Sequence, residues 1–363
     1  RADDGTRAHL TTRNVARDLD QLRGHLGEER LNILGYAYGT YVASVYGTMF
    51  PDRTDRTVLD SSVHPDWPWQ AQFQSQPKAI RRNVLAWAAW VAERPHFGFG
   101  CTSQAVVNTL HAATKELDRR PRAGITGSIW DAAVGIGATR RSRWGKLAFA
   151  LSAILDEEAG EEAGEDDVAY LFGLVRQGLR AGVEPSYTAG EVELRARLTT
   201  HPGAPEGYRE AVMQAVTCEV PWSHDLSDYE ALVREYAEHC PWGLGASRAM
   251  PWVATWHAER PVEPPTRVDR AGYPAGLVVA AEGDPLDDVA GAQEMAARLG
   301  HRLVVVEDDG GHELYPLAGN PHVNAAVEDY LVNGQLPSSP ITRVVGESRP
   351  DIPTAAEGLV LHE

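Results

Sequence analysis

The chain of 363 residues lacks a long apolar run. The longest candidate, residues 84–92, contains two tryptophans and is far shorter than the ~20 residues that cross a bilayer, so we predict no membrane span. The formal net charge of −17 argues against nucleic acids and anionic membranes as partners. With 43% hydrophobic and 23% charged residues, the composition is that of a globular protein with a sizeable core.

Cysteines and metal-binding patterns are also scarce. Three cysteines allow at most one internal disulfide, and we prefer Cys218–Cys240 because both flank a short helical segment; three free buried thiols are the alternative. The histidines are scattered, without an H-x-x-x-H pair or a Cys-x-x-Cys motif, and the glycine clusters have no phosphate-loop pattern. We therefore expect neither a metal nor a cofactor.

An initiator methionine and a visible signal peptide are absent as well. The chain begins at Arg1, and we expect upstream residues either to have been removed or to lie on another chain. A nicked enzyme, with an N-terminal fragment of the same protein as a second chain, is one interpretation of this start.

The most informative stretch of the sequence is 31–40, which reads as a short strand, a sharp turn and the start of a helix. Gly35 and Gly39 bracket Ala37 with the spacing of a nucleophile elbow, in which a strained turn raises the central side chain above the strand ends. We expect glycine at both flanking positions because neighbouring backbone passes too close for a Cβ. Position 37 carries a methyl group where acyl transfer needs a hydroxyl.

Strand and helix patterns alternate at both ends of the chain, which predicts a mostly parallel α/β sheet. The predicted strands are 31–34, 57–60, 277–281 and 302–306. The first predicted core helix contains Val15, Leu19, Leu22 and Leu26 on one face, with N-cap oxygens offered by Thr11, Thr12 and Asn14 and its end at Gly27. The others are a helix through Val42, Val45, Tyr46 and Met49 that ends at Pro51, and the helices 289–299 and 322–331. Between them the spacing is helical, and this region contains all ten tryptophans. The helices predicted there are 70–93, 102–118, 141–158, 166–180, 205–217 and 226–239.

These patterns divide the chain into four parts. We predict an α/β-hydrolase core at 1–64, a helical lid at 65–264, the rest of the core at 265–337, and a C-terminal tail at 338–363 that packs loosely on the surface.

Two loops after later strands can complete a catalytic triad. Asp284 follows the strand 277–281, and His312, on a Gly-Gly loop, follows the strand 302–306. This is the chain order nucleophile, acid, histidine of α/β-hydrolases. The alternatives for the acid are Asp287, Asp288 and Asp60.

The backbone N–H of Tyr38, directly after the nucleophile position, is the predicted oxyanion donor. The second donor normally comes from a loop before the elbow, which we do not find in this chain. Nearby serines such as Ser44 do not replace the missing hydroxyl, because Ser44 lies two helical turns from the elbow.

Several motifs together resemble the actinobacterial tripeptidyl aminopeptidases, α/β-hydrolases related to proline iminopeptidases. They are the elbow 35–41, the segment 50–53 with the strand end 58–60, the helix 16–23 that precedes the elbow, and the C-terminal pattern at 330–337. The resemblance is weaker in the lid, where Cys218 and residues 240–242 carry it. The chain departs from the family at Ala37, in the missing early strands, and in the missing cysteines near Asn320 and Thr342.

The resemblance implies a serine at position 37, with Asp284 and His312 as its partners. It also implies secretion and release of short peptides from a free N-terminus, beneath a lid that limits access. An exopeptidase needs an anchor for the substrate's ammonium group, and Glu219 is the candidate; a surface carboxylate is the alternative. An esterase or amide hydrolase acting on a natural product, which would be cytoplasmic as a biosynthetic-cluster enzyme, remains open.

Two hypotheses account for Ala37. In the first, an engineered Ser→Ala change has inactivated a serine hydrolase whose partner loops are intact. In the second, the chain is a natural pseudoenzyme that binds a ligand beneath its lid. Natural loss of a nucleophile usually relaxes its partners too, which favours the first.

Overall fold

The structure, a computed structural model, describes residues 6–67, 69–156, 165–181, 208–256, 261–270 and 272–352. Two ends of predicted helices, 157–158 and 205–207, lie outside these residues. Among the helices described, none has the length and apolarity that crossing a bilayer requires.

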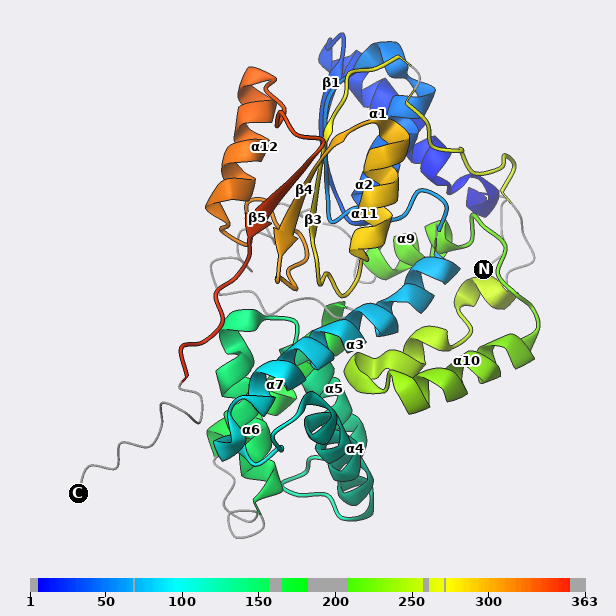
Figure 1. The fold of residues 1–363 in the computed structure, drawn as a ribbon. Helices are drawn as coiled ribbons and strands as arrows, with labels where there is room; N and C mark the ends of the chain where they lie inside the picture. The colour runs from blue at the N-terminus through cyan, green and yellow to red at the C-terminus, as the bar shows by residue number, and fades with distance from the viewer. Residues whose placement is uncertain are drawn as a thin grey trace.

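In the described part, the strands form one parallel sheet in the order β1-β2-β3-β4-β5 (Figure 1). They are β1 (Leu31–Tyr36), β2 (Thr54–Asp60), β3 (Leu277–Ala281), β4 (Arg302–Glu307) and β5 (Ile341–Val345). Every residue of β3 is buried, as expected for a parallel strand covered on both faces. The strands predicted from apolar runs are therefore confirmed, and β2 and β3 pair directly although the whole lid separates them in sequence.

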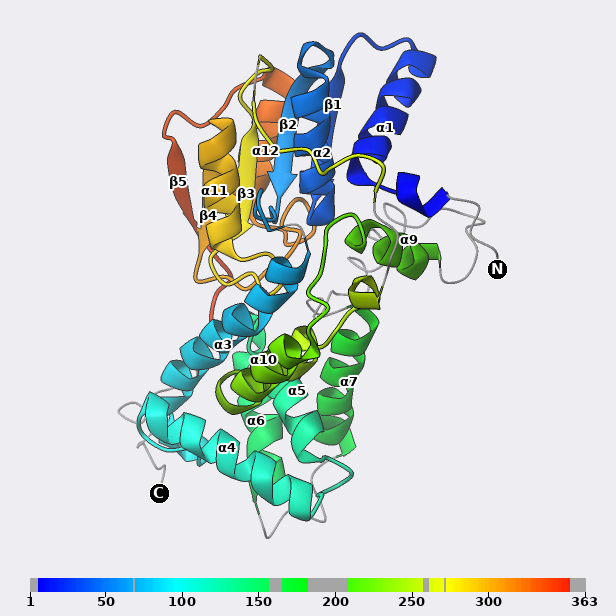
Figure 2. The ribbon, with the colours of Figure 1, turned by 90° about the vertical axis from the view of Figure 1, so that its right-hand side faces the viewer.

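Helices cover both faces of the sheet. On one face lie α1 (Thr12–Leu26), α2 (Tyr38–Met49) and α11 (Val289–Leu299), and on the other lies α12 (Pro321–Asn333) (Figures 1 and 2). The ends of α1 follow the sequence signals: Thr11 Oγ1 accepts a hydrogen bond from Asn14 N, and Gly27 ends the helix at φ 74°.

The lid lies between β2 and β3 in sequence and beyond one end of the sheet in space (Figures 1 and 2). Its helices in the described residues are α3 (Gln70–Ala92), α4 (Ser103–Arg119), α5 (Gly127–Gly137), α6 (Trp144–Leu155), α7 (Glu165–Ala181), α9 (Tyr208–Thr217) and α10 (Leu226–His239). The short 3₁₀ helices that the structure describes are η1 (Thr6–His9), η2 (Pro51–Arg53), η3 (Pro95–Phe97), η4 (Arg141–Arg143), η5 (Trp242–Ala249) and η6 (Val253–Trp256). The lid has its own core, built around buried Trp87, Trp130, Trp144 and Trp242.

The sequence patterns missed α5. This helix is buried on nearly all sides and is rich in glycine, so it shows no apolar stripe with helical period. A Cβ at Gly135 would lie 2.1 Å from Gly243 N, and α5 therefore packs directly against the start of η5.

Two expectations were wrong. The segment after residue 337 does not simply lie on the surface, because β5 pairs with β4 from Leu303–Ile341 to Glu307–Val345. Its residues alternate between partly exposed and exposed, a weak apolar signal that is ordinary for an edge strand. The preferred disulfide is also absent: Cys240 is buried, and Cys218 Sγ contacts Gln214 O at 3.1 Å instead of bonding to Cys240.

Candidate active site

The nucleophile elbow predicted at residue 37 has the backbone geometry that the motif requires. Ala37 lies between β1 and α2 with φ 47° and ψ −119°, a conformation that L-residues rarely adopt. Its N–H donates to Asp60 O at 3.1 Å, and its carbonyl accepts from Thr40 N and Thr40 Oγ1 at 2.9 and 2.6 Å. Hydrogen bonds to both the N–H and the carbonyl group of Ala37 thus stabilise its strained backbone conformation.

The two glycines of the motif play different parts. A Cβ at Gly35 would lie 2.4 Å from Gly39 O and 2.9 Å from Thr40 N, so the first turn of α2 excludes any side chain there. A Cβ at Gly39 would meet nothing within 4 Å. The expectation that both glycines relieve a close approach is therefore correct for Gly35 and wrong for Gly39.

The acid and histidine loops meet beyond the ends of β3 and β4. His312 Nδ1 lies 3.1 and 3.0 Å from the two carboxylate oxygens of Asp284, and both side chains are buried. Asp287 Oδ2 is farther from the same nitrogen, at 3.8 Å. Asp288 caps α11 and pairs with Arg82. Asp284, the predicted acid, thus contacts the imidazole more closely than Asp287, and Asp288 is engaged elsewhere.

Asp60, the remaining alternative, joins the histidine loop to the elbow. Its carboxylate accepts from Leu314 N at 3.0 Å, from Tyr315 N at 2.6 Å and from Ser61 Oγ at 3.2 Å. Its backbone carbonyl accepts from Ala37 N.

A second contact reinforces this connection, since Tyr36 Oη donates to Tyr315 O at 2.6 Å. Leu314 and Tyr315, which follow His312, are therefore tied to the elbow through Asp60 and Tyr36, and the loop that carries His312 is fixed relative to position 37.

The electrostatics of the buried groups follow from this arrangement. Burial lowers the pKa of His312, but the charge of Asp284, its hydrogen bond and the charge of Asp287 outweigh that and raise the pKa to about 10. Burial raises the pKa of Asp60 to about 7, against the opposing hydrogen bonds from Tyr315 N and Leu314 N. Asp284 therefore stabilises the charged imidazolium, which is the form that a general base reaches when it has taken a proton.

Strained residues gather around this site. Among the described non-glycine residues with positive φ, Ala37, Ser61, Asp308 and Glu313 all lie in the loops that follow β1, β2 and β4. Backbone strain persists where the surroundings enforce it, and it concentrates at functional sites.

Tyr38 begins α2, where backbone N–H groups have no partner within the helix. That is the position an oxyanion donor requires. Its side chain points elsewhere: Tyr38 Oη lies 2.9 Å from Thr12 Oγ1, and its ring packs against Trp69 with 5.0 Å between centroids.

Glu219, the predicted ammonium anchor, is not on the surface; it is 4% exposed. Its carboxylate accepts from Thr12 N and Thr12 Oγ1, both at 2.8 Å, and from Trp69 Nε1 at 3.2 Å. Burial raises its pKa, opposed by these three hydrogen bonds. Because Thr12 and Trp69 both contact Tyr38, the lid carboxylate lies two contacts away from the elbow. Sequence patterns gave no sign of these two partners, which are 207 and 150 residues away.

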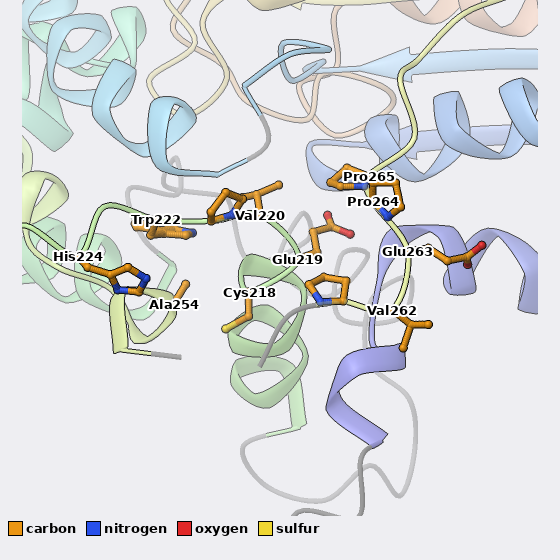
Figure 3. A pocket seen from close by; sticks show the side chains of 12 residues that line it. Cys218, Glu219, Val220, Trp222, His224, Ala254, Val262, Glu263, Pro264 and Pro265 are labelled. Atoms are coloured by element: carbon orange, nitrogen blue, oxygen red, sulfur yellow. The ribbon is translucent and has the colours of Figure 1, made fainter. Parts of the chain in front are cut away.

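A pocket of about 310 Å³ opens beside Glu219 (Figure 3). Its walls come from two segments, the stretch 218–224 of the lid with Ala254, and the proline-rich link 261–265 that returns to the core. Trp222 and His224 line one end and Glu263 the other. In the described residues, no group of three or more His, Cys, Asp or Glu side chains could hold a metal ion.

Parts of the chain are similar in sequence to known peptidases. Residues 242–342, which include Asp284 and His312, match the family described as "TAP-like protein". Over 92% of its length the chain is 30% identical to the tripeptidyl aminopeptidase of Streptomyces lividans and covers 58% of it. Over the same share it is 25% identical to the serine protease Hip1 of Mycobacterium tuberculosis H37Rv, and it covers 61% of that protein. It thus spans about three fifths of these relatives.

A solved esterase structure from Thermogutta terrifontis aligns with 89% of this chain and with 72% of the esterase chain, at 17% sequence identity. The TM-score of 0.32 is too low to bear on fold or function. The parallel sheet, the elbow after β1 and the loops after β3 and β4 give the chain an α/β-hydrolase fold. Its similarity to the tripeptidyl aminopeptidases agrees with the family resemblance found in its motifs.

Proposed function

We propose that this chain carries the catalytic machinery of a serine peptidase, with residue 37 as the nucleophile position, His312 as the general base and Asp284 as its partner. The observation that carries the proposal is the strained elbow at residue 37, tied through Asp60 to the loop of His312. The peptidase relatives support it.

The reaction follows from these positions. With serine at position 37, its hydroxyl attacks the substrate carbonyl while His312 takes the proton. The N–H of Tyr38 donates to the oxyanion, and the proton on His312 passes to the leaving amine. Water then releases the acyl group by the same steps. The methyl group of Ala37 has no proton to give and no lone pair, so the chain with Ala37 forms no acyl-enzyme.

We propose that alanine at this position stands for a serine in the natural enzyme. The partners around it remain in place: His312 and Asp284 are in contact, and the backbone of Ala37 keeps its strained conformation. A natural ligand-binding protein without turnover is the alternative, and the native codon for residue 37 separates the two. A serine codon supports the proposal, and an alanine codon contradicts it.

The substrate that fits best is a short peptide with a free N-terminus. Glu219 places a buried carboxylate near the elbow, on the wall of a pocket, where a substrate ammonium group would pair with it. The alternative, hydrolysis of an ester or amide of a natural product, draws support from the aromatic cluster formed by Trp69, Phe73, Trp222 and Trp252 at the same place.

Replacing Glu219 tests the peptide proposal. In the protein with Ala37→Ser, Glu219→Gln is expected to raise KM for peptide anilides with a free N-terminus by about 10- to 100-fold, because a charge-assisted hydrogen bond is lost. Activity on acetylated peptides or simple esters stays within about threefold. Glu263→Gln is the matched control, since Glu263 lines the same pocket but pairs with Arg17. An equal effect on substrates with and without an amine contradicts the anchoring role.

The pH dependence offers a second test. His312 must be neutral to act as the base, so the raised pKa places its working range above pH 7, and kcat/KM is expected to rise with pH up to about 10. A free peptide loses its ammonium proton near pH 8, so a peptidase with a carboxylate anchor shows a bell-shaped profile. The profile for an ester without an amine continues to rise. Matching profiles for both substrates favour the esterase alternative.

The partner and the location of the protein are proposals too. In the described residues β1 pairs only with β2, which leaves the other edge of β1 open to a further strand. An N-terminal segment of the same protein, on this chain or on a second chain, can supply that strand. The intact mass of the purified native protein separates one chain from two. We also propose that the protein is secreted, as its family resemblance implies; a cytoplasmic biosynthetic enzyme is the alternative, and fractionation of the native host distinguishes them.

A further inference from the structure

A second buried carboxylate, Asp287, lies beside His312 and has no part in the mechanism above. Its Oδ2 is 3.8 Å from His312 Nδ1, and its side chain is 6% exposed. Its other oxygen accepts a hydrogen bond of 2.6 Å from Gln72 Nε2, which belongs to the first turn of the lid helix α3. Asp287 therefore contacts the histidine of the core with one oxygen and the lid with the other.

The lid helix holds the whole acid loop along one of its faces. Gln72, Gln76 and Asn83 are spaced by four and seven residues, so they share a side of α3. The two glutamine amides donate to Leu286 O at 2.8 and 3.3 Å, and Asn83 Nδ2 donates to Gly283 O at 2.7 Å. The loop 283–287 is thus fixed to the lid on either side of Asp284.

The charged groups that face His312 come from three loops. Asp284 and Asp287 lie on the loop after β3, Glu313 is its neighbour in sequence, and Asp60 lies at the end of β2. Asp284 is held by its own loop, since it accepts from Leu286 N and Asp287 N. Asp60 is held by the histidine loop.

Asp287, by contrast, is held by the lid. Burial raises the pKa of its carboxyl group, the charge of His312 opposes that rise, and the charge of Asp284 adds to it. The hydrogen bond from Gln72 Nε2 favours the ionised carboxylate, so losing it weakens the negative charge beside the imidazole.

We propose that Asp287 is a positioning residue through which the lid sets the basicity of His312. Gln72 holds the Asp287 carboxylate next to the imidazole, where its charge adds to that of Asp284 and stabilises the imidazolium. When α3 moves away from the acid loop, this support weakens, so the histidine is most basic when the lid is seated. The inference rests on the proposed role of His312 as the base.

The test is a titration of His312 by ¹⁵N NMR in the protein with Ala37, which requires no turnover. Asp287→Asn keeps the shape of the side chain and an acceptor for Gln72 but removes the charge. It is expected to lower the pKa of His312 by about one. Asp288→Asn is the matched control, because Asp288 lies next in sequence but caps α11 and pairs with Arg82. Equal His312 pKa values in the two variants overturn the proposal.

A second pair of variants tests the link to the lid. Gln72→Leu is expected to move the pKa of His312 in the same direction as Asp287→Asn, because the carboxylate loses the donor that favours its ionised form. Gln76→Leu removes a donor to the Leu286 carbonyl from the same helix face but leaves the bond to Asp287. If Gln72→Leu and Gln76→Leu act alike, the contact is structural and the lid does not set the histidine's basicity.

The same shift appears in the kinetics if His312 is the base. In the protein with Ala37→Ser, Asp287→Asn is expected to move the acid limb of kcat/KM to lower pH, in step with the NMR titration. A restored serine that fails to react, while the titration behaves as described, contradicts the proposed function and leaves the Asp287 interaction standing. An unshifted titration in a reactive protein contradicts the inference alone.

Discussion

In the protein with Ala37→Ser, His312→Ala and Asp284→Asn are each expected to lower kcat for a peptide anilide by about 10⁴-fold. The first change removes the base. The second removes the charge that stabilises the imidazolium and fixes the tautomer with a proton on Nδ1, since both oxygens of Asp284 lie within 3.1 Å of that nitrogen. Steady-state rates on the purified variants measure both effects, with circular dichroism to verify that they fold.

Asp288→Asn serves as the control for the loop, because its carboxylate faces α11 and Arg82 rather than the imidazole. Its kcat is expected to stay within about threefold of the parent. Combining His312→Ala with Asp284→Asn should add little to either change alone, since the two residues act as a unit. A collapse of kcat in Asp287→Asn together with near-normal activity in Asp284→Asn would assign the triad acid to Asp287.

Gly35→Ala is expected to destabilise the fold by about 1–3 kcal/mol and, in the protein with Ala37→Ser, to abolish labelling at position 37. The three atoms nearest to the added Cβ are backbone atoms of Gly39 and Thr40, and these cannot rotate away as a flexible side chain can. Relief requires moving β1 away from the first turn of α2, which displaces the elbow itself. Urea unfolding followed by circular dichroism measures the stability change.

Gly39→Ala is the matched control, four residues along in the same motif. A Cβ there meets nothing within 4 Å, and the position lies in α2, where alanine is favoured over glycine by up to about 1 kcal/mol. This variant is expected to be as stable as the parent or slightly more stable. Equal destabilisation by both changes would contradict the close approach at Gly35.

The sequence predicted the parts of the fold that have a local signal. Apolar runs predicted β1 to β4, and caps such as Thr11 and Gly27 marked helix ends. It could not predict α5, whose burial on nearly all sides erases the helical period, or β5, whose edge position leaves few apolar residues. Those two elements become recognisable only through their tertiary neighbours, η5 and β4.

The candidate site divides in the same way. Ala37, Asp284 and His312 were accessible to sequence reasoning because each follows a strand end in the chain order of a known motif. The partners that hold them were not: Gln72 on Asp287, Trp69 on Glu219 and Ser61 on the N–H of Glu313 are contacts between distant segments. The sequence indicated Asp287 only as an alternative triad acid. Its hydrogen bond from Gln72 of the lid supports the role of a positioning residue instead.

The measurement that tests the central claim most directly is covalent labelling at residue 37. The complete gene product with Ala37→Ser and the same protein with Ala37 are treated with a fluorophosphonate, and their intact masses are compared. We predict one added label in the Ala37→Ser protein and none in the Ala37 protein, with the labelled peptide containing residue 37. Both proteins remaining unlabelled would contradict the account, because the strained elbow would then present no activated nucleophile even with its hydroxyl restored.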